Sequence, residues 1–157
     1  VWGDMEGESG RIEGNIGRNP NDRRLFMVFP EGEDGKWAVT RWRTLERFYY
    51  CTLIECQLET GRTHQIRVHL KSKGHTLFGD PRYGGNQILK GTLHSKYKQF
   101  VEGCLELLPR QALHAKVLGF IHPRTGLHVR FESELPKDMQ SVIERWRTYV
   151  NARKGTV

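Results

Sequence analysis

The sequence predicts an α+β fold in which helices pack on a mostly antiparallel sheet. Short β-rich segments separated by turn signals fill about the first 60 residues. Apolar residues then recur at helical spacing in later segments. The length of 157 residues suits one domain with a genuine core, and 37% hydrophobic against 27% charged residues indicates a globular chain.

The strands are expected to come first. A short strand is expected at 11–16, in a start rich in Gly, Asn and Asp, and an apolar strand at 25–29. Asp34-Gly35 is a hairpin turn signal. The alternating segment KWAVTRWRTL (36–45) and the β-rich segment RFYYCTLIECQLE (47–59) follow it. Together these segments predict an antiparallel meander.

A helix is expected after Thr60-Gly61, which breaks the last of these strands. It runs from about 64 to 73, with Thr63 as its N-cap and Gly74 at its C′ position. The loop GHTLFGDPRYGGNQ (74–87), punctuated by Gly and Pro, follows it. Residues 64–73 are therefore expected to form a short helix with defined ends, followed by a long loop.

The two faces of this helix are expected to differ. Ile66 and Leu70 are four residues apart and share the side that packs on the core. By the same periodicity His64, Arg67 and Lys71 share another face. These cations are therefore expected to point together, away from the packing side.

The rest of the chain predicts two helices and a hairpin. The apolar residues of 97–105 repeat at helical spacing, and so do those of 139–150, where Pro136 lies near the first turn. Between them, QALHAKVLGFIHP and LHVRFESELP are expected to be two strands joined by the turn HPRTG.

Basic residues are concentrated in one part of the chain. The net charge is +7, and the stretch 60–100 holds one acid, Asp80, against eight bases. These bases are Arg62, Arg67, Lys71, Lys73, Arg82, Lys90, Lys96 and Lys98. Such an excess is typical of a face that binds phosphates, and a solvated helix surface is the alternative.

Several other kinds of site are not indicated. Cys51, Cys56 and Cys104 follow no zinc-ligand spacing and are expected to be reduced thiols of a cytoplasmic protein. His64 and His69 lie about 140° apart around a helix, so no shared metal is expected. No G-x-G-x-x-G follows a strand, and no Walker or G-x-S-x-G pattern occurs. No run of about 18 apolar residues indicates a membrane span.

The start of the first helix, GRTHQIR, suits an anion. A helix N-terminus favours negative charge, and an arginine there gains most by pairing with a carboxylate or a phosphate. A structural ion pair between Arg67 and an acid of this same chain is the alternative, and spacing alone leaves both open.

The segment LETGRTHQIRVHLKSKGHTLFGDPRYGG strongly resembles the hallmark of the RNA pseudouridine synthases that modify large-subunit rRNA and some tRNAs. The segments RQALHAKVLGFIHPRTG, FESELPKDM and GRIEGNIGR resemble other parts of the same family, so the resemblance covers essentially the whole chain. It implies that residues 1–157 are the C-terminal part of a pseudouridine synthase catalytic domain. The chain holds neither the HRLD motif nor, at the matching position, the K-x-Y motif, which supply the family's catalytic Asp and Tyr.

The resemblance also implies the chemistry. The family isomerises uridine to pseudouridine without a metal or organic cofactor, and the HQIR arginine, here Arg67, pairs with the catalytic Asp. With that Asp absent, this chain is expected to be inactive alone. Asp80 is the tempting substitute, but GDPRYG matches a family loop that we take to be structural.

The remaining site residues are expected to contact RNA, which is large-subunit rRNA or tRNA. Arg62, Lys71, Lys73 and Arg82 would position it through phosphates. His64 and Gln65 would either contact RNA or brace the loop. A non-catalytic RNA-binding module and a basic structural domain are the alternative functions. Since a truncated sheet exposes an edge, the chain is expected to self-associate or to cover that edge with its own N-terminal segment.

Overall fold

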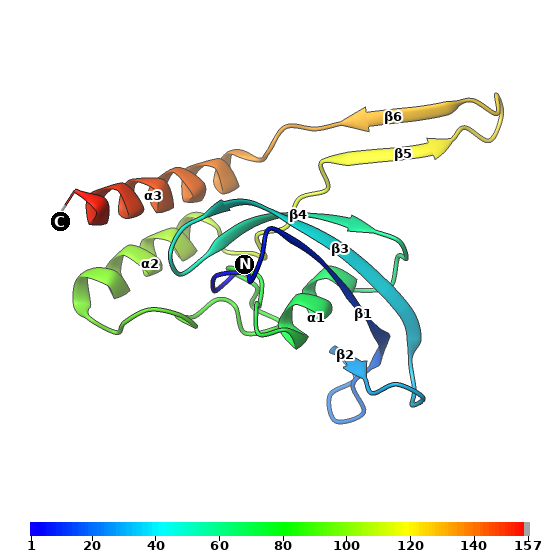
Figure 1. Ribbon diagram of the computed structural model, residues 1–157, viewed down its shortest axis with the longest axis horizontal. Helices are drawn as coiled ribbons and strands as arrows, with labels where there is room; N and C mark the ends of the chain where they lie inside the picture. Colours follow the sequence, from blue (N-terminus) through cyan, green and yellow to red (C-terminus); the bar gives the residue numbers. More distant parts are fainter. Residues whose placement is uncertain (156–157) are drawn as a thin grey trace.

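The computed structural model describes residues 1–155 and confirms the α+β class (Figure 1). Its main sheet has four antiparallel strands in the order β2-β1-β3-β4. Their bounds are β1 Ser9–Arg18, β2 Phe26–Phe29, β3 Lys36–Arg47 and β4 Thr52–Leu58. Helix α1 (Gln65–Ser72) packs on β1, β2 and β3, on one face of this curved sheet.

The predicted meander is wrong in its first half. β1 lies between β2 and β3, so that Asn15 pairs with Phe29 on one side and with Trp37 on the other. The segment around Asp34-Gly35 therefore joins two strands that do not pair with each other. β1 is also longer than the expected strand at 11–16. Gly14 within it allows a close approach of β2, since a Cβ there would lie 2.7 Å from Val28.

The ends of α1 differ in how well the sequence predicted them. The predicted cap at Thr63 is wrong: His64 is the N-cap, with left-handed backbone (φ 55°), and no side chain caps the helix. Gly74 follows the helix with φ 79°, and its N–H donates to the Lys71 carbonyl at 2.9 Å, as predicted for a C′ glycine.

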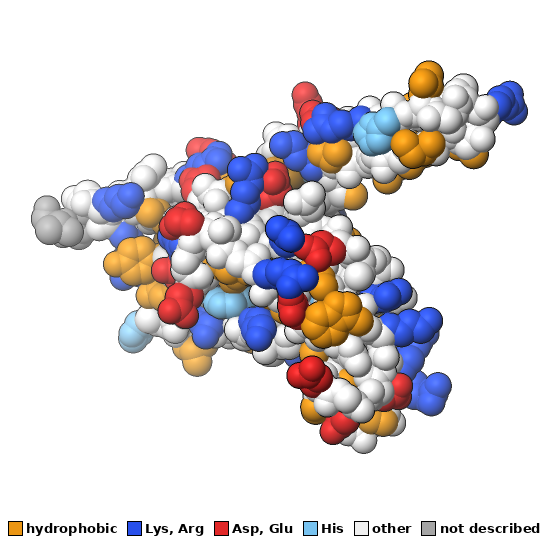
Figure 2. Space-filling view, turned by 45° about the vertical axis from the view of Figure 1, so that its right-hand side comes forward, with side chains coloured by type: hydrophobic (Ala, Val, Ile, Leu, Met, Phe, Trp, Pro, Cys, Tyr) orange, Lys and Arg blue, Asp and Glu red, His pale blue; other side chains and the backbone are white. Residues whose placement is uncertain are grey.

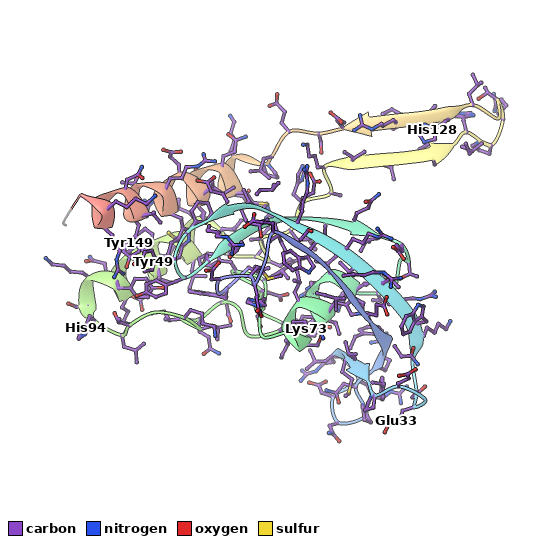
Figure 3. The ribbon with its side chains drawn as sticks, viewed as in Figure 1. Glu33, Tyr49, Lys73, His94, His128 and Tyr149 are labelled. Carbon is purple, nitrogen blue, oxygen red and sulfur yellow. The ribbon has the colours of Figure 1, made fainter. Side chains whose placement is uncertain are left out.

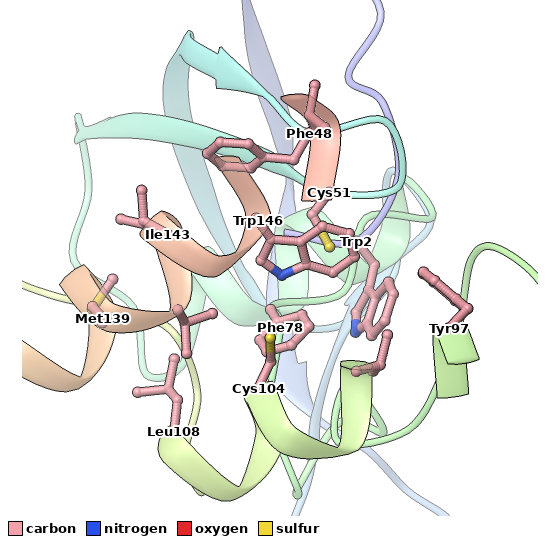
Figure 4. Packing of buried hydrophobic residues seen from close by; sticks show 13 residues of the cluster. Trp2, Phe48, Cys51, Phe78, Tyr97, Cys104, Leu108, Met139, Ile143 and Trp146 are labelled. Carbon is pink, nitrogen blue, oxygen red and sulfur yellow. The ribbon is translucent and has the colours of Figure 1, made fainter. Parts of the chain in front are cut away.

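The two other helices pack together over the largest hydrophobic cluster (Figure 4). They are α2 (Ser95–Leu107) and α3 (Lys137–Lys154), and both confirm the predicted periodicity. The cluster includes Trp2, Phe78 and Trp146, whose rings pack within 6.4 Å of one another. None of the helices in residues 1–155 has the length and apolar character needed to cross a membrane.

The predicted hairpin forms, as β5 (Val117–Ile121) and β6 (His128–Glu132), and it is a separate two-stranded sheet. It projects from the body of the molecule (Figure 1), and hydrophobic side chains are exposed along it (Figure 2). At the free edge of β4, the N-terminal segment covers only the first residues, where Val1 and Thr52 exchange two backbone hydrogen bonds of 2.9 Å.

Candidate functional site

Arg67 and Asp80 form a buried ion pair. The Nε and Nη2 groups of Arg67 donate to the two carboxylate oxygens of Asp80 at 2.7 and 2.8 Å. Asp80 is fully buried and Arg67 is 9% exposed. The sequence left open whether Arg67 pairs within this chain, and Asp80 is that partner. Pairing of Arg67 with a further aspartate from elsewhere stays a prediction.

The loop 79–85 holds Asp80 rigidly. One carboxylate oxygen also accepts the backbone N–H groups of Arg82 at 3.1 Å and Tyr83 at 3.3 Å. Gly85 has no room for a side chain, because a Cβ there would lie 1.9 Å from the Leu77 carbonyl oxygen. With four hydrogen bonds and no exposed surface, Asp80 is a fixed counter-charge for Arg67 rather than a group that can reach a substrate.

The Nη1 group of the Arg67 guanidinium has no hydrogen-bond or ion-pair partner in residues 1–155. The Nε–Nη2 edge is taken by Asp80. The hydrogen bond from Asp80 also raises the pKa of Arg67. A guanidinium fixed by one edge can therefore still offer the other to a second anion.

The Tyr83 side chain contacts all three residues that were predicted to share a face of α1. Arg67 lies 4.9 Å and Lys71 5.6 Å from the centroid of its ring. His64 Nδ1 lies 2.8 Å from the Tyr83 hydroxyl. The shared face is confirmed. Lys71 on this face is exposed, as predicted, whereas Arg67 is buried against the Tyr83 ring, contrary to the prediction. No role was predicted for Tyr83, although it is an aromatic residue within the basic stretch 60–100.

His64 is neutral near pH 7. The Tyr83 hydroxyl accepts the Phe26 N–H at 3.1 Å, so it is free to donate its own proton to His64 Nδ1. Burial, followed by the charge of Arg67, lowers the pKa of His64. His64 is thus suited to accept or donate single hydrogen bonds rather than to act as a cation.

Gln65 braces the entrance to α1. It is 3% exposed, and its Oε1 accepts from the Thr60 hydroxyl at 2.8 Å and the Arg62 N–H at 2.9 Å. Its Nε2 donates to the Val39 carbonyl at 2.9 Å and the Thr40 hydroxyl at 3.0 Å. Of the two roles expected for Gln65, these hydrogen bonds bear out the brace, because its amide is fully engaged inside the protein; an RNA contact of Gln65 stays a prediction.

Four cations around this core are exposed: Arg62, Lys71, Lys73 and Arg82. None of the four forms an ion pair with another residue of 1–155, whereas Arg41, Arg43 and Arg147 all do. Lys73, at the end of α1, is labelled in Figure 3. Unpaired cations around a buried arginine leave positive charge available to a polyanion.

The chain is similar in sequence to proteins named as RNA pseudouridine synthases. The family model described as RNA pseudouridylate synthase matches residues 4–72. A relative in Chlorobaculum parvum, named an uncharacterised RNA pseudouridine synthase, is 46% identical over 157 residues, which is 99% of this chain and 47% of that protein. A protein of Zymomonas mobilis named ribosomal large subunit pseudouridine synthase D is 43% identical over 131 residues, 83% of this chain and 38% of that one.

A solved structure shares the fold. The human RNA pseudouridylate synthase domain containing 4 aligns with a TM-score of 0.58 and 24% identity, over 89% of this chain and 57% of that one. This chain spans less than half the length of the two relatives described above, 47% and 38%.

Proposed function

We propose, from the premise that this chain belongs to the RNA pseudouridine synthase family, that its full-length protein isomerises uridine to pseudouridine. Residues 1–157 would be the C-terminal part of the catalytic domain. Large-subunit rRNA is the proposed substrate class, because relatives in Zymomonas mobilis and Nitrosomonas europaea carry that substrate in their names. Transfer RNA is the alternative substrate, and the proposed location is the cytoplasm.

One observation carries the proposal: Arg67 is anchored by Asp80 on one edge, with Nη1 unpartnered in residues 1–155. The reaction breaks the N-glycosidic bond, turns the base and rejoins it through carbon. The family's catalytic Asp, expected upstream of Val1, would pair with the Nη1 edge. That contact would hold the carboxylate ionised and fix its direction. The saturated Asp80 cannot take this role.

The exposed cations complete the proposed site. Arg62, Lys71, Lys73 and Arg82 would bind RNA phosphates and so set the position of the substrate without reading its sequence. A uridine must leave its stack to reach a carboxylate beside Arg67, so base flipping is part of the proposal.

The test uses the full-length protein with two substitutions at the same position. Arg67→Ala is expected to abolish or severely reduce pseudouridine formation, measured by mass spectrometry of modified RNA. Arg67→Lys keeps a cation for Asp80 but cannot hold two carboxylates on separate edges, so it is expected to fold and still lose most activity. Arg43→Ala, an exposed arginine paired with Glu55, is the matched control. Near-normal turnover in Arg67→Lys would remove Arg67 from the catalytic centre.

The chain by itself is proposed to be inactive. The purified 157-residue chain should form no pseudouridine, because it lacks the HRLD and K-x-Y motifs. Pseudouridine formed by this chain alone would contradict that proposal.

The missing motifs also support a second candidate, a non-catalytic RNA-binding module that uses the same cations. The sequence upstream of Val1 separates the two: an HRLD followed by a K-x-Y favours the enzyme, and their absence from the gene product favours the module. Both require RNA binding that weakens steeply with salt. A basic structural domain without an RNA role would show little binding at moderate salt.

A further inference from the structure

The turn between β3 and β4 contains a strained aromatic residue. Tyr49 has φ 72°, a left-handed value, and the N–H of Tyr50 donates to the carbonyl of Phe48 at 2.8 Å across it. Such an i→i+2 turn with positive φ is rare and strained, and glycine would adopt it more easily. The backbone conformation therefore does not explain why a tyrosine occupies this position, and we consider its side chain instead.

Arg153 of α3 fixes the ring of Tyr49. Its guanidinium carbon lies 4.7 Å from the Tyr49 ring centroid, and its Nη1 donates to the hydroxyls of Tyr50 at 3.3 Å and Tyr149 at 2.8 Å. Tyr149 in turn stacks on Phe100 of α2, with ring centroids 4.8 Å apart and an angle of 14°. Figure 3 labels Tyr49 and Tyr149, which lie beside each other at the end of the body remote from the hairpin.

The ring is held, yet it remains accessible. Tyr49 is 59% exposed, so its anchoring to Arg153 leaves more than half of the residue in contact with solvent. The segment 145–154 contains four basic residues and no acid. Glu46 of β3 and Glu144 of α3 both pair with Arg147, and no ion pair joins Arg153 to a carboxylate in residues 1–155. An exposed, preorganised aromatic ring next to an arginine is the arrangement that stacks nucleobases.

We propose that Tyr49, backed by Arg153, is a stacking site for an unpaired base of the RNA substrate, separate from the Arg67 centre. The inference rests on the proposed function for the identity of its ligand. Base stacking on a tyrosine tolerates any of the four bases, so this site contributes affinity and placement rather than sequence selection.

The strained backbone makes a sharp test possible. In the full-length protein, Tyr49→Gly relieves the φ strain and removes the ring, whereas Tyr49→Phe keeps the ring. Binding of a fluorescein-labelled single-stranded oligoribonucleotide is measured by anisotropy at fixed salt, and stability by thermal unfolding. We expect Tyr49→Gly to bind about 5- to 100-fold more weakly at a melting temperature no lower than that of the parent protein. Tyr49→Phe should match the parent in both.

The control is a variant that removes a different exposed aromatic ring. Phe131→Ala removes an equally exposed ring, 58% in the hairpin, and should leave RNA binding unchanged. Equal affinity of Tyr49→Gly and the parent, or a parent that binds no single-stranded RNA, would overturn the stacking site. Loss of binding in Tyr49→Gly, in a parent that forms no pseudouridine, would keep the stacking site and reject the proposed reaction. If Tyr49→Gly still forms pseudouridine and binds the oligoribonucleotide as tightly as the parent does, the proposed reaction stands and the stacking site is rejected.

Discussion

The region around Arg67 buries charged side chains, whereas the β5–β6 hairpin exposes apolar ones. Around Arg67 a buried cation meets a fully buried carboxylate, and each has several hydrogen bonds. Along the hairpin, Leu118, Ile121 and Phe131 are each 58–61% exposed, on two strands that pair with each other. Both partners of the Arg67–Asp80 ion pair lie within this chain. The hairpin resembles a surface that another segment should cover, because isolated two-stranded hairpins are marginal in water.

The largest expected effect comes from breaking the buried ion pair. Asp80→Ala should lower the free energy of unfolding of this chain by roughly 3–5 kcal/mol, because it leaves the Arg67 guanidinium buried without its counter-charge. Urea unfolding measures the loss. Glu59→Ala, which removes the exposed partner of Arg41 and Arg11, is the control and should cost at most about 1 kcal/mol. Equal losses in the two variants would mean that Asp80 is not a buried counter-charge.

The next effect comes from the brace at the entrance to α1. Gln65→Ala removes an amide that serves four partners, and so leaves the Val39 carbonyl and the Arg62 N–H without it. We expect a loss of about 2 kcal/mol in the free energy of unfolding. Arg62→Ala, a change on the adjacent exposed side chain, should be nearly neutral for stability and should weaken RNA binding. A Gln65→Ala variant with unchanged stability but weakened RNA binding would return Gln65 to the RNA-contacting residues.

A smaller effect should appear on acidification. His69 is fully buried; its Nδ1 lies 2.8 Å from the Thr40 hydroxyl, and burial lowers its pKa below the usual 6.5. The unfolded chain therefore binds the proton more readily, and this stability is present above pH 6.5 and is lost as the pH falls toward the folded-state pKa. The slope approaches at most about 1.4 kcal/mol per pH unit for each such histidine. His64 contributes in the same direction.

His69→Gln should make the pH dependence shallower. Urea unfolding at pH 7.5 and 5.5, above the range in which the carboxylates titrate, measures the difference for the parent and the variant. If the two chains lost stability equally between these pH values, His69 would not be the titrating group.

Sequence reasoning succeeded where local pattern decides the outcome. The faces of α1, the glycine at its end and the two strands of the hairpin all follow from periodicity and turn chemistry. It failed where distant residues decide. The central place of β1 depends on pairing with two strands, and a glycine-rich segment gives no propensity signal for it. The role of Gln65 depends on Val39 and Thr40, which lie 26 and 25 residues away in the chain.

The candidate site divides in the same way. The motif predicts Arg67 and the exposed cations as site residues from their residue types alone, and their roles stay predictions. It could not identify Asp80 as the partner of Arg67, since an ion pair across 13 residues depends on how the loop 79–85 folds. Tyr83 was missed for the same reason: only the folded loop brings its side chain against His64, Arg67 and Lys71.

The smallest effect on stability is expected in the hairpin, where the same experiment can ask what covers it. Phe131→Lys should change the free energy of unfolding of this chain by no more than about 0.5 kcal/mol, because the residue is 58% exposed. We expect the parent chain to self-associate through this surface and the variant to do so less, as measured by analytical ultracentrifugation. If a segment upstream of Val1 covers the hairpin, Phe131→Lys should instead destabilise the full-length protein by 1 kcal/mol or more, about the cost of burying an unpaired charge after partial relaxation. The contrary outcome is a monomeric parent chain in which Phe131→Lys leaves the free energy of unfolding unchanged, both in this chain and in the full-length protein. The hairpin would then be a free surface, and its contrast with the Arg67 region would be lost.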